Sequence, residues 1–153
     1  MKNRLVLTFL MAYSLFSGVC FAGFNEGLDA AQRGDFATAL KEWGPMAEQG
    51  DPGAMLNLGV LYQYGEGVPQ NRVIAYTLFK RAAMFYSIGC ELRKAQSRQH
   101  LEGSCNVNNF SKKRDEFEAQ LTPLELNASR KLFDQIDARN LLSVLEQYIR
   151  SAR

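Results

Sequence analysis

Three cysteines and one histidine are the residues of this 153-residue chain that most readily bind metals or undergo redox chemistry. Cys90 and Cys105 stand on either side of His100. Such a pair forms a structural disulfide or supplies two ligands to zinc. Structural zinc needs four ligands, normally at tighter spacing, and redox enzymes use a CxxC spacing that this pair lacks. We therefore expect a structural disulfide between Cys90 and Cys105, with zinc as the alternative, and no cofactor.

Motifs for hydrolytic or covalent catalysis are absent from the sequence. It contains no Gly-x-Ser-x-Gly turn, no HExxH and no phosphate-binding glycine loop, and a single histidine leaves little room for a catalytic triad. The Ser-x-x-Lys pair of serine acyl transfer is also missing, because the nearest match, which starts at Ser111, has arginine at the lysine position. We expect the protein not to be an enzyme.

The first 22 residues have the features of a secretory signal peptide. Basic residues precede an apolar stretch that starts at Leu5, and Cys20 and Ala22 place small residues at the −3 and −1 positions of a cleavage site. The alternative is an uncleaved membrane anchor, because the apolar run approaches the length that spans a bilayer. We expect cleavage after Ala22, which makes the mature chain periplasmic or secreted, without membrane insertion.

Cleavage would leave a mature chain of balanced charge. The signal segment holds two of the 18 basic residues and none of the 16 acidic ones. A balanced chain has no concentrated basic field, so we expect neither nucleic acid nor an anionic membrane as a partner. Cleavage would also remove Cys20 and leave Cys90 and Cys105 in an oxidising compartment, which favours the disulfide.

Residues 50–83 have the pattern of a helical hairpin. Asp51 can cap a helix whose first residue is Pro52, and Gly65 and Gly67 can adopt the positive φ of a turn. A second helix should start at Arg72. Small and aromatic residues that let two helices approach closely follow at three- and four-residue spacing: Ala75, Phe79, Ala82 and Ala83.

Part of this pattern occurs earlier in the chain. The order small, aromatic, small recurs at an offset of 36 residues, first in Ala39, Trp43 and Ala47 and then in Ala75, Phe79 and Ala83. Residues 24–33 read as a short helix before the first copy, with Gly34 and Asp35 as turn and cap. The sequence thus predicts helical hairpins that stack, because a single hairpin cannot bury both sides of its apolar face.

The sequence LNLGVLYQYGEGVPQN, followed by AYTLFKRAA, resembles the Sel1-like repeats, relatives of the tetratricopeptide repeats. In this resemblance Gly59 takes the small position of the first helix, and Gly65 and Gly67 take the turn. The resemblance covers one full repeat, and residues 34–49 look like a preceding half repeat. It implies an all-α fold over residues 23–83, in which helix pairs stack into a short solenoid.

The resemblance also implies that the first helix of each pair lines a concave surface that binds a protein. Asn57, Val60 and Tyr64 share a helical stripe apart from the apolar core face, and we expect them to contact the partner. Some Sel1-like proteins with disulfides have been labelled β-lactamases, so a β-lactamase-like hydrolase is a remote alternative.

After Ala83 the sequence departs from the repeat pattern. Residues 84–110 are expected to form a disulfide-pinned insertion, with a short helix over 91–101, which serves either as a binding element or as a cover for the open end of the array.

Residues 111–153 resemble the terminal helices of Sel1-like arrays. Ser111 should cap one helix, residues 122–125 should form a capping box for the next, and Asp137 should cap the last. The apolar face of the last helix either covers the stack or forms a dimer seam, which makes the protein a monomer or weak dimer.

These features together predict an exported, non-enzymatic scaffold or adaptor of the bacterial cell envelope that binds a protein or peptide. The alternatives are a secreted effector and an immunity or inhibitor protein that binds one specific enzyme.

Overall fold

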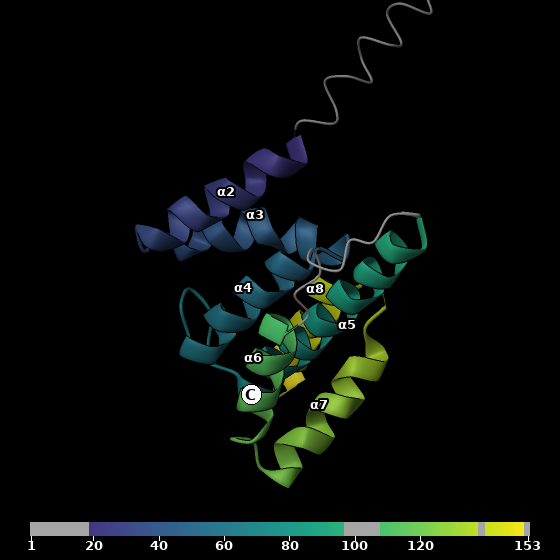
Figure 1. The fold of residues 1–153 in the computed structure, drawn as a ribbon. Coiled ribbons are helices and arrows are strands. Elements are labelled where there is room, and N and C mark those ends of the chain that lie inside the picture. Colours follow the sequence, from purple (N-terminus) through teal and green to yellow (C-terminus); the bar gives the residue numbers. More distant parts are fainter. Residues whose placement is uncertain (1–18, 97–107, 138–139, 152–153) are drawn as a thin grey trace, which may run out of the picture.

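The computed structural model describes residues 19–96, 108–137 and 140–151. Within these ranges the regular secondary structure is entirely helical, which confirms the all-α prediction. Figure 1 shows the helices following one another from α2 at one end to α7 at the other. The helices are α2 (Val19–Gln32), α3 (Phe36–Glu48), α4 (Pro52–Tyr64), α5 (Arg72–Gln96), α6 (Asn108–Glu118), α7 (Pro123–Gln135) and α8 (Leu141–Ser151).

The first hairpin joins α2 to α3 through a short turn. Gly34 adopts a φ of 77°, which glycine reaches without steric cost. Asp35 then caps α3, because its carboxylate accepts a hydrogen bond from the backbone N–H of Thr38 at 3.1 Å. The whole of α2 precedes this turn, which confirms the helix predicted over residues 24–33, although α2 begins earlier, at Val19.

The second hairpin joins α4 to α5, and its ends form as the sequence predicts. The Asp51 carboxylate accepts a hydrogen bond from the N–H of Ala54 at 2.7 Å, and Pro52 takes the first helical position. Gly65 ends α4 in the left-handed conformation with a φ of 75°. Asn71 then caps α5 by accepting from the N–H of Ile74 at 3.0 Å.

Helix α5 is longer than the repeat pattern predicts. It continues past Ala83 without a break and spans 25 residues, from Arg72 to Gln96. The separate short helix expected over 91–101 is therefore wrong: residues 91–96 form the last part of α5, and 97–101 lie outside the described residues. The helix continues because no proline interrupts it, and because Tyr86 stacks on Phe110 of α6 with ring centroids 4.4 Å apart.

Helices α6 and α7 both pack against α5. Helix α6 begins at Asn108, so Ser111 lies inside it and does not cap it as expected. The capping box of α7 is present. Thr122 accepts a hydrogen bond from the N–H of Glu125, and its own N–H donates to the Glu125 carboxylate at 2.8 Å.

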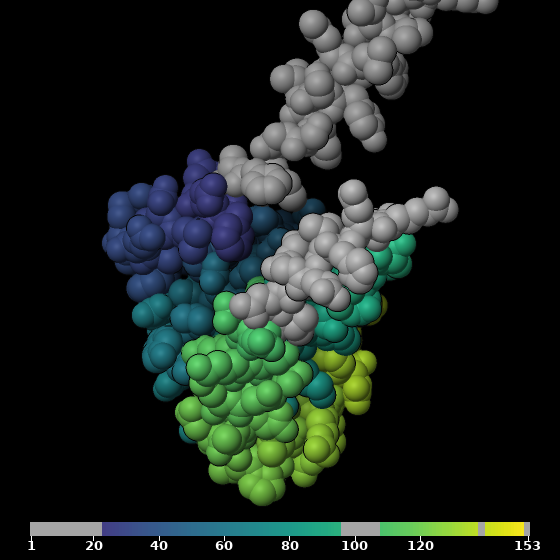
Figure 2. Space-filling view, viewed as in Figure 1, coloured from purple at the N-terminus to yellow at the C-terminus, as the bar shows by residue number. Residues whose placement is uncertain are grey.

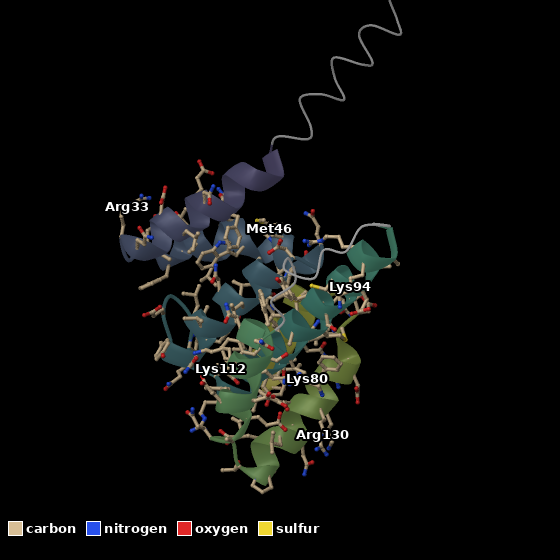
Figure 3. All side chains as sticks on the ribbon, viewed as in Figure 1. Arg33, Met46, Lys80, Lys94, Lys112 and Arg130 are labelled. Atoms are coloured by element: carbon tan, nitrogen blue, oxygen red, sulfur yellow. The ribbon has the colours of Figure 1, made fainter. Side chains whose placement is uncertain are left out.

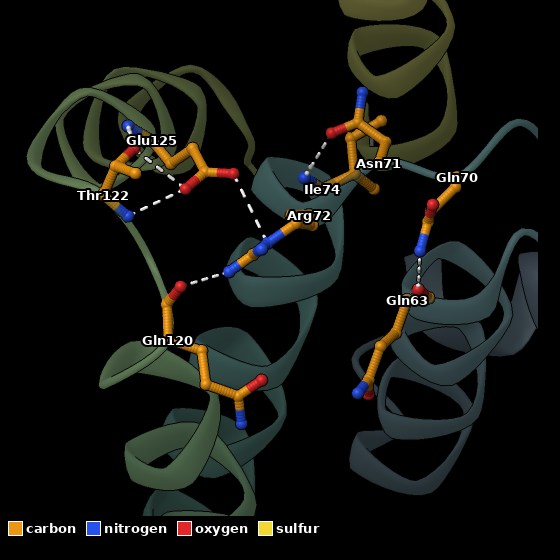
Figure 4. A network of polar contacts seen from close by, with 8 residues as sticks. All are labelled: Gln63, Gln70, Asn71, Arg72, Ile74, Gln120, Thr122 and Glu125. Carbon is orange, nitrogen blue, oxygen red and sulfur yellow. Dashed lines mark hydrogen bonds and ion pairs between the residues drawn. The ribbon is translucent and has the colours of Figure 1, made fainter.

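Arg72, at the start of α5, contacts the segment that joins α6 to α7 (Figure 4). Its guanidinium donates a hydrogen bond to the carbonyl oxygen of Gln120, and it lies 3.4 Å from the Glu125 carboxylate. One side chain thus contacts both the end of the α6–α7 turn and the cap of α7.

Helix α8 contacts both α3 and α7. Its apolar face is buried through Leu141 and Leu145. The residue next to its first turn is Asn140, whose carbonyl accepts from the N–H of Val144. The expected cap by Asp137 is therefore wrong: the N–H of Asp137 instead donates to the Asn140 side chain at 2.7 Å.

Candidate functional site

The predicted partner-binding residues lie along one line of α4, at spacings of three and four residues. Tyr64 is the most accessible of them, with 61% of its surface exposed at the C-terminal end of the helix. Asn57 is half-buried. Val60 is partly buried and packs against the core, so it offers only part of its side chain. The stripe offers one exposed aromatic ring and, about two turns earlier, a half-buried amide, groups that suit contact with another protein better than catalysis.

Two glycines hold the hairpins of this surface together. A Cβ at Gly59 of α4 would lie 2.5 Å from the Phe79 ring, and a Cβ at Gly27 of α2 would lie 2.3 Å from Trp43. Both rings are almost fully buried. Each hairpin is therefore built on an aromatic ring of its second helix pressed against a glycine of its first.

Trp43 belongs to the repeat pattern predicted from the sequence, whereas no role was predicted for Gly27. Phe79 follows Gly59 by 20 residues, whereas Trp43 follows Gly27 by 16, because the turn before α5 is four residues longer than the turn before α3. A comparison at one constant offset therefore misses the pair. Trp43 is also anchored by its indole N–H, which donates to the carbonyl of Phe24 in α2 at 3.3 Å.

The alanines of the repeat pattern are also in the core. Ala39, Ala47, Ala75 and Ala83 are between 0% and 3% exposed. Gly67 takes a φ of 70°, and a Cβ there would meet Phe36 of α3 at 2.6 Å. The turn of the second hairpin thus packs on the first, which places α4 firmly between its neighbours.

Helix α6 covers the second side of Phe79. The Phe79 and Phe117 rings meet edge to face, with centroids 5.4 Å apart. Tyr76, one turn earlier in α5, donates a hydrogen bond from its hydroxyl to the Glu118 carboxylate at 2.5 Å. Burial raises the pKa of Tyr76, and the hydrogen bond to Glu118 raises it further. Tyr76 therefore stays protonated and works as a structural donor, not as an acid or base.

Arg81 joins α5 to the end of α7. Its side chain is 4% exposed, and it donates a hydrogen bond to the carbonyl of Ile136 at 3.0 Å. Burial lowers the pKa of Arg81, and the nearby Asp137 opposes that effect. Its guanidinium also lies 5.5 Å from the ring centroids of Phe85 and Phe133. The guanidinium thus pairs with a carbonyl at the buried C-terminal end of α7, which marks Arg81 as structural.

The residues first considered for chemistry are only partly described. Cys90 is 1% exposed within α5, whereas Cys105 and His100 lie outside the described residues. The disulfide between Cys90 and Cys105 therefore stays a prediction. Within the described ranges, no three His, Cys, Asp or Glu side chains are grouped so that they could hold a metal ion. Ser111 lies in α6, where the nearby cations are arginine and lysine side chains of its own helix and of α5.

The geometry defines a class of protein before any comparison is made: an α-helical repeat protein of stacked antiparallel hairpins. Comparison with known families then specifies the repeat. Residues 52–84, which form α4 and the first half of α5, match the model of the Sel1 repeat. Sel1 repeats generally mediate contacts between proteins and are typically non-enzymatic scaffolds.

No curated protein and no solved structure matches the chain. In the part of the chain that the structure describes, no helix is both long enough and apolar enough to cross a bilayer. The predicted signal peptide lies mostly in residues 1–18, outside the described ranges, and its predicted cleavage point after Ala22 falls within α2.

Proposed function

We propose that the protein is an exported, non-enzymatic scaffold of the bacterial cell envelope that binds a partner protein on the α4 surface formed by Asn57, Val60 and Tyr64. The observation that carries this proposal is the Sel1 repeat itself, with Tyr64 projecting from its first helix. Tyrosine gives a large contact area at a low cost in conformational entropy and is common among the residues that dominate binding.

The rigid surroundings of α4 support this proposal. Asp51 caps its first turn, Gly59 in its middle lies against the Phe79 ring, and the turn after it packs on α3. A surface held on three sides needs little ordering when a partner binds, so less of the interaction energy is lost.

Export is part of the proposal and rests on the signal-like first 22 residues. The pairing of Cys90 with Cys105 belongs to it as well, because disulfides form in the periplasm or outside the cell. We further propose that α6, α7 and α8 cap the array, since α6 and α7 pack on α5, the last helix of the second hairpin, and α8 packs on α7 and α3.

The first experiment is affinity capture of the mature chain from envelope extract, followed by titration with the partner that it identifies. The double variant Asn57→Ala with Tyr64→Ala should bind that partner at least about tenfold more weakly, with an unchanged melting temperature. Leu124→Ala is the matched control, because Leu124 is 79% exposed on α7, away from α4. Equal affinity of the double variant and the control would refute the α4 surface.

A further inference from the structure

A second accessible surface lies on α5, on the part that starts at the last residue of the Sel1 match, Met84, and continues beyond it. Met84, Ile88 and Leu92 are 36%, 48% and 60% exposed, and they follow one another at four-residue spacing. Residues four apart lie on the same side of a helix, so the three side chains form one continuous row, which we call the α5 stripe. Isolated exposed apolar residues are ordinary, whereas a row of three on one helix indicates a binding surface.

The α5 stripe leads into a cleft of about 400 Å³ between α5, α6 and α7. Met84 belongs to both. The cleft is lined by Lys80, Ala83, Met84, Ser87, Ser111, Arg114 and Phe133. In the space-filling view, the green residues of α6 make up much of the face shown (Figure 2). The cleft combines an apolar floor with two hydroxyl groups, which are available to hydrogen-bond a ligand.

The charge of this cleft has one sign. Its lining includes Lys80 and Arg114 and no acidic residue. Arg114 is paired with its neighbour Asp115 at 2.6 Å. Among the described residues Lys80 forms no ion pair, and its ammonium lies 4.5 Å from the Phe133 ring centroid, which holds it at the cleft (Lys80 is labelled in Figure 3). Lys80 is therefore a positioned cation without a carboxylate, one turn before the apolar stripe.

We propose that the α5 stripe and this cleft bind an amphipathic segment of another protein, with apolar side chains along the stripe and a carboxylate at Lys80. A helix with apolar residues at four-residue spacing matches the stripe, and an acidic residue at one end matches the unpaired ammonium. None of these residues lies on α4, so the surface is additional to the one in the proposed function.

The probe is a fluorescein-labelled helical peptide of about 18 residues, with leucines at four-residue spacing and glutamates at both ends. A second peptide has lysines in place of those glutamates. Fluorescence anisotropy with the full mature chain should show saturable binding of the acidic peptide and at least about tenfold weaker binding of the basic one. Binding of the acidic peptide should also weaken with added salt.

Two variants locate the binding site. Lys80→Glu should weaken the acidic peptide at least about tenfold and improve the basic peptide, which a purely structural role of Lys80 would not do. Met84→Asp should weaken both peptides. The controls are Lys112→Glu, an exposed lysine of α6 that pairs with Glu116, and Leu124→Asp on α7, and both should leave binding unchanged. If Met84→Asp lowers the melting temperature, Leu92→Asp replaces it, because Leu92 is the most exposed residue of the stripe.

Three results would overturn the proposal: no saturable binding of the acidic peptide, equal binding of the two peptides, or equal weakening by the controls and the stripe variants. Self-association of the wild type that Met84→Asp abolishes in sedimentation experiments would also overturn it, because the α5 stripe would then bind a second copy of this chain. The peptide test reports only on α5, so its outcome is independent of partner capture through Asn57 and Tyr64.

Discussion

At the scale of single residues, the fold depends on two glycines that have no room for a side chain. The Phe79 ring lies against Gly59, and the Trp43 ring lies against Gly27. Since both rings are buried, neither can move aside without opening a cavity in the core. These pairs set the distance between the helices of each hairpin, and so the shape of the surface that α4 presents.

Gly59→Ala should destabilise the protein by roughly 1–3 kcal/mol, because the added methyl group would overlap the Phe79 ring and crowd the carbonyl of Ala75. Gly27→Ala should have an effect of similar size through Trp43. The measurement is urea unfolding followed by circular dichroism.

Gly89→Ala is the control for both substitutions. Gly89 lies inside α5, and an added Cβ there meets nothing within 4 Å. Alanine should stabilise this position by about 0.5–1 kcal/mol, since glycine is the poorer helix former. A Gly59→Ala variant as stable as the Gly89→Ala variant would show that the Phe79 ring does not press on α4.

At the scale of helices, local signals determine where the elements begin and end. Helix α7 is the clearest case, because Thr122 and Glu125 exchange hydrogen bonds across its first turn. Hydrogen bonding from the Thr122 N–H lowers the pKa of Glu125, and Arg72 lowers it further. The same carboxylate thus takes part in the start of α7 and in its attachment to α5.

Glu125→Gln should reduce the loss of stability in acid. Because the pKa of Glu125 is lowered in the folded state, the unfolded chain takes up the proton more readily. The stability that Glu125 contributes is fully present above its ordinary pKa of 4.5 and is lost as the pH falls through the pKa of the folded state. Urea unfolding at a series of pH values from neutral to acidic should show a shallower decline for this variant than for the wild type.

The control for this measurement is Glu116→Gln. Glu116 pairs with Lys112 on the surface of α6 and belongs to no capping box. The free energy of unfolding of the Glu116→Gln variant should depend on pH as that of the wild type does. If Glu125→Gln also followed the wild type, the Thr122 hydrogen bond would contribute nothing to the stability of α7.

At the scale of the whole molecule, the helices beyond the repeat complete the core. Phe117 of α6 covers Phe79, and Arg81 of α5 holds the end of α7. Helix α8 then returns to α3, where the side chain of Leu142 lies beside Gly44 and its N–H donates to the Glu48 carboxylate. The segment that matches the Sel1 repeat thereby becomes part of a larger helical stack, in which α8 contacts both α3 and α7.

The predicted bond between Cys90 and Cys105 should stabilise this stack by constraining the unfolded chain. Cys105→Ser should lower the free energy of unfolding by roughly 3 kcal/mol under oxidising conditions, the amount expected for a loop of this length. Cys105 is the better site for the substitution, because Cys90 is buried and its replacement would also disturb packing.

Two measurements check this prediction. Thiol titration of the oxidised, denatured mature chain should detect no free thiol, and a reducing agent should lower the stability of the wild type but not of Cys105→Ser. Two free thiols in the oxidised protein, or equal stability of the two proteins, would contradict the pairing.

Most helix ends of this protein, and the type of its repeat, can be predicted from the order of its residues alone. Capping by Asp51 and by Thr122 with Glu125, and the positive φ of Gly65, act within a few residues and can be read along the chain. The same locality explains the failures. At Ser111 and Asp137 a suitable capping residue was present, but the helix began elsewhere, because packing against other helices outweighs the modest energy of a cap.

The contacts between distant residues, and the surfaces that stay open, depend instead on how the helices pack in three dimensions. The pairing of Gly27 with Trp43 depends on the length of a turn, and the continuation of α5 depends on partners such as Phe110, far along the sequence. The exposure of Met84, Ile88 and Leu92 likewise depends on where α6 and α7 lie. Burial is a property of the packed molecule, because it is set by helices that are neighbours in space and not in sequence.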